Sequence, residues 1–439
     1  MESYQPKDLK LFKYCETFFK KALVVLEQYI EAGAYIPLIT YYKPVARTNN
    51  DGNGKITEYV PYEDRDFVYI VCKCYNKLLD LPELKTAKNY ILEKRYLVIG
   101  GSNFAPSVLL TQALIYFLKK TGCLNYREKE FVDIYANIEN LIFHNEFQFR
   151  TTAKLNNFSY GNGLIELDKM HLIKRYTQQD CEEIYRHPSI NIYDHTLPLP
   201  GDFKIEIEIN KDKSNWGTAC IEGKDAVKCV LTALRLFKDS EVGIATLENE
   251  PITWFPFTSK CAQLLPPPKT GELCSISETE IPELIHLWQI IKSANDDNCP
   301  SLNIAIKRFN YAHDHKNRED ALIDIMIGLE ALYMMKDERS ELRYKLTLRV
   351  ATFLEASLSV HKGRKEAIFD AVYEAYKLRS NVVHGSKVAD AEIWKCRIVK
   401  TYLSDSIKQF ARLSRKYKHK QVLNKIDKCI KSGETLGAP

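Results

Sequence analysis

The chain has 439 residues, of which 45% are hydrophobic and 27% are charged, and its formal net charge is +5. This length predicts two or three domains, and the composition excludes a disordered chain and a collagen-like repeat. Because the net charge is small, any affinity for a polyanion must come from local clusters of Lys and Arg.

The start of the chain and the cysteines set the expected compartment. The first residues, MESYQPK, hold no apolar stretch of the kind that a signal peptide needs, and no later run is as long as a membrane span. The twelve cysteines are scattered, and none has zinc-finger spacing. We therefore expect a soluble cytoplasmic protein with reduced thiols, no cofactor, no metal and no membrane contact.

The first 270 residues mix helical and extended patterns. Apolar periodicity predicts helices over 9–32, 105–144 and 225–238, and extended segments over 242–257. The turn cluster NNDGNGK at 49–55 predicts a hairpin or loop, and it fails as a calcium loop because Val60 stands where the bidentate Glu belongs. Residues 201–209 (GDFKIEIEI) alternate apolar and charged side chains, as a half-exposed strand does.

A proline-rich segment separates this region from an all-helical one. The sequence LPPPKTG at 265–271 can continue neither a helix nor a strand. Beyond it, periodicity predicts helices over 281–294, 301–313, 318–335, 338–358, 364–384 and 389–417. The predicted fold is therefore multidomain, with an N-terminal mixed α/β (α+β) region at 1–270, of one or two subdomains, and an all-α bundle at 276–439.

Three segments of the helical region carry a family motif. They are RFNYA at 308–312, ALIDIMIGLEALY at 321–333 and YKLRSNVVHG at 376–385. Together they resemble the Apea-like branch of the HEPN superfamily, and the resemblance covers about residues 301–413. It implies a HEPN helical bundle whose motif is Arg, a polar residue, three further residues and His, here supplied by Arg379, Ser380 and His384. Many HEPN nucleases have Asn directly after the Arg, whereas here Asn381 follows Ser380.

A second Arg and His pair, Arg308 and His313, has the same spacing. The later pair is favoured because it lies in the full LRSNVVHG string and has Glu330 upstream in the family's other helix. We expect HDHKN at 313–317 to be a solvated turn between helices, with a metal site on its two His and one Asp as the alternative.

Arg379 and His384 suit metal-independent RNA cleavage. His384 can accept the 2′-OH proton or donate one to the departing 5′-oxygen, because a His exchanges protons near neutral pH. Arg379 can bind two phosphate oxygens with its planar fork. The alternative is structural, with Arg379 capping carbonyls or pairing with Glu330 and His384 lying in a dimer interface. A Glu in so apolar a helix needs a cation, and the candidates are Arg379, Arg343 and Arg349.

Arg379 and His384 cannot share one face of an ideal helix, because five residues turn it through about 140°. The resemblance implies that two HEPN domains pair with their motifs facing each other, so we expect a homodimer in which the second His supplies the missing acid. Gly385 is expected to end the helix just after His384.

The C-terminal helices are strongly basic. Their density of positive charge suits contact with RNA phosphates, and the candidate RNA-binding residues are Arg412, Arg415, Lys416, Lys418 and Lys420. The alternative is a solvated helical face or a poorly ordered tail.

The resemblance thus implies an endoribonuclease that leaves 2′,3′-cyclic phosphate and 5′-OH ends on RNA, such as tRNA or single-stranded loops. By analogy we expect a stress or antiviral (anti-phage, abortive-infection) defence effector whose N-terminal region binds an unknown trigger. The alternative is a non-catalytic HEPN module that binds RNA, a nucleotide or a protein partner.

Overall fold

The computed structural model describes residues 4–48, 55–99, 102–185, 198–213, 215–254, 256, 261–265, 271–296, 299–335, 337–338 and 340–432. Within them the chain is mixed α/β with a helical C-terminal region. It divides into two compact units. Unit 1 comprises Met1–Lys154, Asp168–Val227 and Thr246–Leu265, and unit 2 comprises Leu155–Leu167, Lys228–Ala245 and Pro266–Pro439. One boundary falls beside the proline-rich segment, whose residues 266–270 lie outside the described ones.

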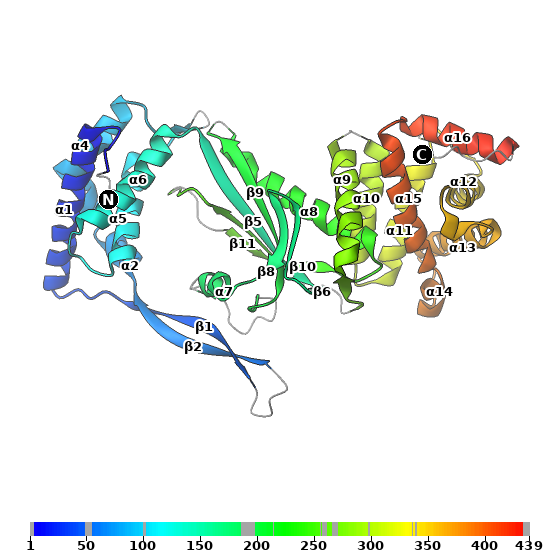
Figure 1. Cartoon of the computed structure of the whole chain (residues 1–439), viewed down its shortest axis with the longest axis horizontal. Coiled ribbons are helices and arrows are strands. Elements are labelled where there is room, and N and C mark those ends of the chain that lie inside the picture. Colours follow the sequence, from blue (N-terminus) through cyan, green and yellow to red (C-terminus); the bar gives the residue numbers. More distant parts are fainter. Residues whose placement is uncertain are drawn as a thin grey trace. The chain divides into compact units, whose positions relative to one another are not determined.

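Helices form the first part of unit 1 (Figure 1). They are α1 (Leu9–Glu31), α2 (Phe67–Lys73), α3 (Tyr75–Asp80), α4 (Pro82–Glu93), α5 (Pro106–Thr121) and α6 (Glu128–Phe143). The predicted helix over 9–32 is confirmed, and Asp8 caps it by accepting the backbone N–H groups of Lys10 and Leu11. The stretch 105–144 is helical as predicted, and it forms two helices because Gly122 ends α5 in the left-handed region at φ +64°.

A long antiparallel hairpin lies between α1 and α2 in the sequence (Figure 1). Its strands are β1 (Leu38–Thr48) and β2 (Lys55–Arg65), and Thr48 pairs with Lys55. The predicted hairpin is therefore confirmed, while the turn at 49–54, including the approximate calcium loop, lies outside the described residues. A short pair, β3 (Val98–Ile99) with β4 (Ser102–Asn103), precedes α5.

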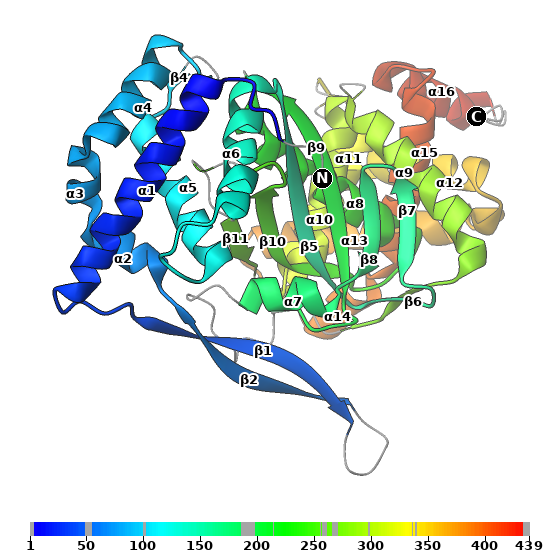
Figure 2. The ribbon, with the colours of Figure 1, turned by 60° about the vertical axis from the view of Figure 1, so that its left-hand side comes forward.

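Among the described residues, six strands form one sheet in the order β11-β10-β5-β9-β8-β7 (Figure 2). They are β5 (Glu146–Asn156), β7 (Leu164–Asp168), β8 (His171–Arg175), β9 (Phe203–Asp212), β10 (Gly243–Pro251) and β11 (Cys261–Leu264). Helix α7 (Gln178–Tyr185) follows β8, and α8 (Ala219–Phe237) precedes β10. In unit 2, β6 (Phe158–Tyr160) pairs in parallel with β12 (Cys274–Ile276).

The strand predicted at 201–209 is present, but its half-exposed character is wrong. In β9 every residue from Phe203 to Ile207 is buried, and Lys204 and Glu206 are each only 3% exposed. The strand pairs with β5 on one side and with β8 on the other, so it is internal to the sheet. Its charged side chains are buried because they meet opposite charges on neighbouring elements, which the alternation pattern cannot reveal.

Unit 2 ends in a set of packed helices. They are α9 (Ile281–Asp296), α10 (Pro300–Asp314), α11 (Arg318–Tyr333), α12 (Leu342–Ser357), α13 (Lys365–Val383), α14 (Asp390–Lys395), α15 (Ile398–Ser414) and α16 (His419–Ser432). The helical region is as predicted, except that the helix expected over 389–417 is two helices. At Gly328, an added Cβ would lie 2.9 Å from the Leu403 side chain, so α11 and α15 pack closely there. None of the described helices is both long and apolar enough to cross a membrane.

Candidate functional site

Glu330 and Arg379 come together from two helices. Glu330 lies in the last turn of α11, and Arg379 lies one turn before the end of α13. The distance from Arg379 Nη2 to Glu330 Oε2 is 3.8 Å, and both side chains are partly buried. Of the three arginines that the sequence left open as partners of Glu330, the structure selects Arg379.

Arg349 has a different role. Its buried guanidinium donates to both oxygens of Glu338 at 2.8 Å and to both oxygens of Asp427 at 2.7 and 2.8 Å. It also donates to the carbonyl oxygen of Tyr333 at 2.8 Å. These contacts fix the end of α11 against α12 and α16, and they leave Arg349 no free donor for a substrate.

The surroundings of Glu330 shift its proton affinity. Burial raises the pKa of its carboxyl group, and the charge of Arg379 and a hydrogen bond from the Tyr376 hydroxyl lower it only in part. Arg379 Nε is buried and makes no hydrogen bond among the described residues. The site therefore combines a guanidinium with a spare donor and a carboxyl group whose pKa lies above its usual value.

His384 lies at the exposed end of α13. It is the C-cap residue, and its backbone N–H donates to the carbonyl oxygen of Ser380 at 3.1 Å. Gly385 follows at φ +77°, and its N–H donates to the carbonyl oxygen of Val382 at 2.9 Å, so the expected helix end is confirmed. The side chains of His384 and Asn381 are exposed, whereas Ser380 is partly buried.

The predicted motif residues are therefore only partly gathered. Glu330 and Arg379 form one contact, but among the described residues no hydrogen bond or ion pair joins either of them to His384. No family model matches this chain, and no curated protein or solved structure matches it. The chemistry of the site must therefore be argued from its own residues.

The segment 313–317 is in part the solvated turn that the sequence suggested, because Lys316 and Asn317 are exposed between α10 and α11, but its two histidines are packed or paired. His313 is 4% exposed in the last turn of α10, with its ring 4.7 Å from that of Phe309. His315 contacts the buried carboxylate of Asp324 through Nε2 at 2.8 Å, and Arg308 donates to the other oxygen of Asp324 at 2.6 Å. Asp324 was the missed signal, because a carboxylate in an apolar helix requires a partner.

The expected metal alternative at 313–317 finds no support in the part of the chain that the structure describes. There, no three His, Cys, Asp or Glu side chains are grouped so that they could hold a metal ion.

The basic C-terminal residues lie at the end of α15, in the turn that follows it and in α16. In α16 the residues Val422, Leu423 and Ile426 are buried, so the described residues up to Ser432 are not a loose tail. The candidate RNA-binding side chains face solvent, namely Arg412, Arg415, Lys416, Lys418 and Lys420. Asp427, the main opposing charge, is occupied by Arg349. The exposed face of this region is thus predominantly positive, as contact with phosphates requires.

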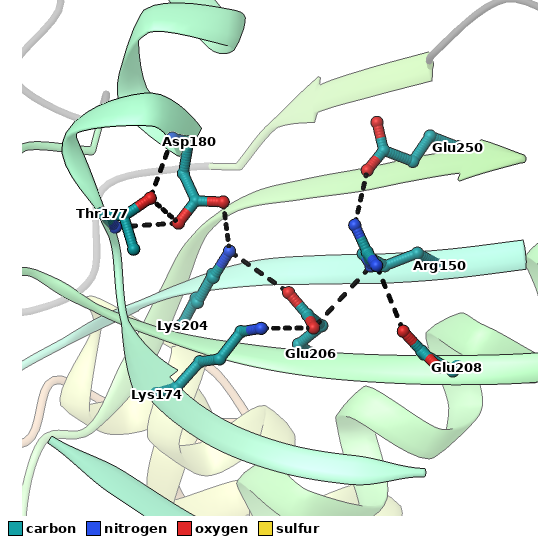
Figure 3. Close-up of polar contacts among 8 residues, drawn as sticks. All are labelled: Arg150, Lys174, Thr177, Asp180, Lys204, Glu206, Glu208 and Glu250. Atoms are coloured by element: carbon teal, nitrogen blue, oxygen red, sulfur yellow. Dashed lines mark hydrogen bonds and ion pairs between the residues drawn. The ribbon is translucent and has the colours of Figure 1, made fainter. Parts of the chain in front are cut away.

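A second cluster of charges lies on one face of the sheet in unit 1 (Figure 3). Glu206 contacts Lys174 at 2.6 Å, Lys204 at 3.2 Å and Arg150 at 3.7 Å. Lys204 also contacts Asp180 on α7 at 2.9 Å. Although burial acts to raise the pKa of Glu206, the three cations hold it below the usual value.

This cluster neutralises itself. Arg150 contacts Glu208 at 3.1 Å and Glu250 at 3.7 Å as well as Glu206, so each cation drawn in Figure 3 faces at least one carboxylate. Its cations are therefore engaged by the protein itself, and the arrangement is typical of a structural network that fixes α7 and four strands in register.

Proposed function

We propose that the helical part of this protein cleaves RNA without a metal ion, as a member of the HEPN superfamily. In this proposal Arg379 and His384 carry the reaction, and Glu330 holds Arg379 in the catalytic site. One observation supports this most directly. Arg379 is held beside Glu330 with its Nε unoccupied, one helical turn from an exposed His384 at a helix end. A guanidinium that can bind phosphate and an exposed residue that can transfer protons are thereby close in sequence.

The reaction needs two proton transfers. The 2′-oxygen attacks the adjacent phosphorus while a neutral His384 accepts the 2′-OH proton, and the bond from phosphorus to the 5′-oxygen breaks. A protonated His384 of a second protomer donates to the departing 5′-oxygen. Arg379 stabilises the negative phosphate oxygens throughout. The products are a 2′,3′-cyclic phosphate and a 5′-OH, so no atom or electron is left over.

Ser380 and Asn381 have supporting roles in this proposal. The Ser380 carbonyl oxygen helps to end the helix at His384, and the exposed Asn381 side chain can contact the RNA backbone. We further propose, by family analogy alone, that the protein is a cytoplasmic antiviral or stress effector and that its N-terminal region responds to a trigger.

A non-catalytic HEPN module is the second candidate. It is favoured by the absence of a contact between Arg379 and His384 among the described residues, because a pure binding surface does not need these groups to cooperate. Such a module would bind RNA, a nucleotide or a protein and leave the RNA intact.

The deciding experiment incubates purified protein with total RNA in EDTA and maps the ends that form. We expect cleavage by the wild type, none by His384→Ala, and a large loss for Arg379→Lys, since an ammonium group cannot reproduce the bidentate fork. Because His384 is exposed, the free energy of unfolding of the alanine variant should lie within about 1 to 2 kcal/mol of the wild-type value. Intact RNA with the wild type, or cleavage that persists in His384→Ala, would favour the non-catalytic module.

A further inference from the structure

Trp394 combines an exposed ring with two cations. It lies on the short helix α14, and it is 50% exposed. The guanidinium carbon of Arg318 lies 4.9 Å from the centroid of its ring, and that of Arg397 lies 4.7 Å away. Arg318 begins α11 and Arg397 immediately precedes α15, so cations from two helix ends are directed at one ring.

The local fold keeps this ring at the surface. Ile393 and Cys396, on either side of Trp394, are 5% and 6% exposed and anchor the short helix. The backbone N–H of Arg397 donates to the carbonyl oxygen of Trp394 at 3.2 Å, which fixes the turn into α15. One exposed apolar side chain is ordinary on a protein surface, so the convergent guanidinium groups are the informative feature.

The two cations are only weakly neutralised. Arg318 Nη1 lies 3.9 Å from Asp390 Oδ2, and both side chains are more than half exposed, so solvent screens the pair. Arg397 is exposed and has no ion-pair partner within the described part of the chain. Both guanidinium groups lie over the Trp394 ring, so a base of single-stranded RNA would stack by displacing one of them, and the displaced cation would then meet a phosphate.

We propose that Trp394, Arg318 and Arg397 form a base clamp that holds single-stranded RNA away from the cleavage motif. This inference rests on the proposed function, because RNA is the substrate there. Arg318 and Glu330 lie near opposite ends of α11, about 18 Å apart along its axis at 1.5 Å per residue. The clamp therefore selects unpaired RNA, since a base inside a duplex is already stacked and cannot use the ring.

The test measures binding rather than cleavage. In a His384→Ala background, the affinity for a fluorescently labelled single-stranded RNA of about a dozen nucleotides is compared between variants. Trp394→Leu should weaken binding at least about fivefold, whereas Trp394→Phe retains a stacking face and most of the affinity. Arg318→Gln and Arg397→Gln should each lower the salt slope by about 0.7.

The matched control is Tyr69→Leu. Tyr69 is 41% exposed and has the Lys73 ammonium 5.3 Å from its ring, so it reproduces an exposed ring beside a cation at a site with no proposed role. Its substitution should leave RNA affinity unchanged. Tryptophan emission gives a second readout, because Trp394 is the most exposed of the four tryptophans and stacking should quench it.

The outcomes separate the clamp from the nuclease. Unchanged affinity in Trp394→Leu with unchanged emission on adding RNA overturns the clamp and leaves the ring as a link between α11 and α14 or a contact for another protein. An equal loss in Trp394→Phe also overturns it, because stacking was not the cause. Should Trp394→Leu fail to fold, Arg397→Gln keeps the ring and still tests the salt slope. Quenching by RNA in a wild type that cleaves nothing would sink the nuclease alone.

Discussion

Glu206 links the cations on the charged face of the sheet, because its carboxylate contacts all three of them. Three cations from three strands contact its carboxylate, and the side chain is 3% exposed (Figure 3). Removing one member of a buried charge network strongly lowers the free energy of unfolding, because the remaining charges stay buried without a partner. Replacing the whole network by apolar residues costs much less.

We expect Glu206→Gln to lower the free energy of unfolding by about 3 kcal/mol, measured by urea titration. The control is Glu208→Gln, two residues along the same strand. Its side chain is 35% exposed, and among the described residues its ion-pair partner is Arg150. That change should cost less than about 1 kcal/mol. Equal costs for the two variants would mean that burial does not set the strength of this network.

Individual contacts were the hardest features to predict. The apolar context of Glu330 required a cation, but the sequence did not decide between Arg343, Arg349 and Arg379. The packing of α11 on α13 selected Arg379, which is the farthest of the three along the chain. For Lys204 and Glu206, the alternation of apolar and charged residues in β9 predicted that the charged side chains would face solvent. The same pattern arises when the polar face is covered and its charges are paired.

At the scale of elements, Glu280 joins the start of α9 to Lys238, the residue that follows α8. Its carboxylate accepts the backbone N–H and the hydroxyl of Ser277, each at 2.8 Å, in a capping box, and it contacts Lys238 at 2.8 Å. The hydrogen bond from Lys238, followed by those from Ser277, lowers the pKa of Glu280 from 4.5 to about 2.

A carboxyl group with a lowered pKa stabilises the folded state while it is ionised. The contribution of Glu280 is therefore fully present above pH 4.5 and is lost as the pH falls through about 2. We expect the difference in urea midpoint between wild type and Glu280→Gln to shrink over this window. Gln retains the capping geometry, so the comparison isolates the charge. A difference that stays constant with pH would remove ionisation as the cause.

The basic surface near α16 makes a salt-dependent prediction. If these residues guide RNA, replacing Arg415, Lys416, Lys418 and Lys420 with Gln should weaken binding and flatten its salt dependence, by about 0.7 in slope for each phosphate that is no longer neutralised. Cleavage of saturating RNA should change much less. The matched control replaces four exposed lysines of unit 1, namely Lys73, Lys77, Lys85 and Lys94. If both variants had the same salt dependence of binding, the basic surface would have no specific role in RNA binding.

Helix periods were predicted well, but their interruptions were not. The helices of unit 2 follow the apolar pattern closely, because each buries one stripe against its neighbours. The breaks at Gly122 and near Cys396 occur within patterns that remain apolar on both sides, so local periodicity continued across them. At Gly122 the glycine itself was the signal that the periodicity outweighed, whereas no such residue marks the turn at Cys396.

At the scale of the whole molecule, the nuclease proposal requires two chains. In one chain no described contact joins Arg379 to His384, and a single motif offers one residue that transfers protons near neutral pH. A two-fold interface would place a second motif opposite the first without any further sequence.

Activity per protomer should therefore collapse on dilution below the dissociation constant of the dimer. An excess of His384→Ala protein should also poison the wild type by forming mixed dimers, whereas an excess of a Tyr69→Leu protein should not. Light scattering at each concentration gives the oligomeric state. Full activity in a sample that is monomeric by this measure would end the composite-site hypothesis, and Glu330 would then be examined as the acid.

The sequence predicted only one boundary between the two units of the molecule. The proline-rich segment marks one boundary, but the pairing of β6 with β12 and the assignment of 228–245 to unit 2 depend on contacts between distant segments. The local composition of these earlier segments does not indicate that they belong to the later unit.

The interleaved course of the chain restricts how the helical unit can be released. A protease that cut at the proline-rich segment would leave 271–439 without β6 and without Arg235, whose buried side chain donates to Asn310 at 3.0 Å and to Asp314 at 2.6 Å on α10. Excision at this segment is therefore a poor way to release an intact helical unit from this polypeptide. During translation, the early segments of unit 2 are made long before α16, and the unit is complete only when α16 has been synthesised. A prematurely terminated chain therefore lacks a complete unit 2.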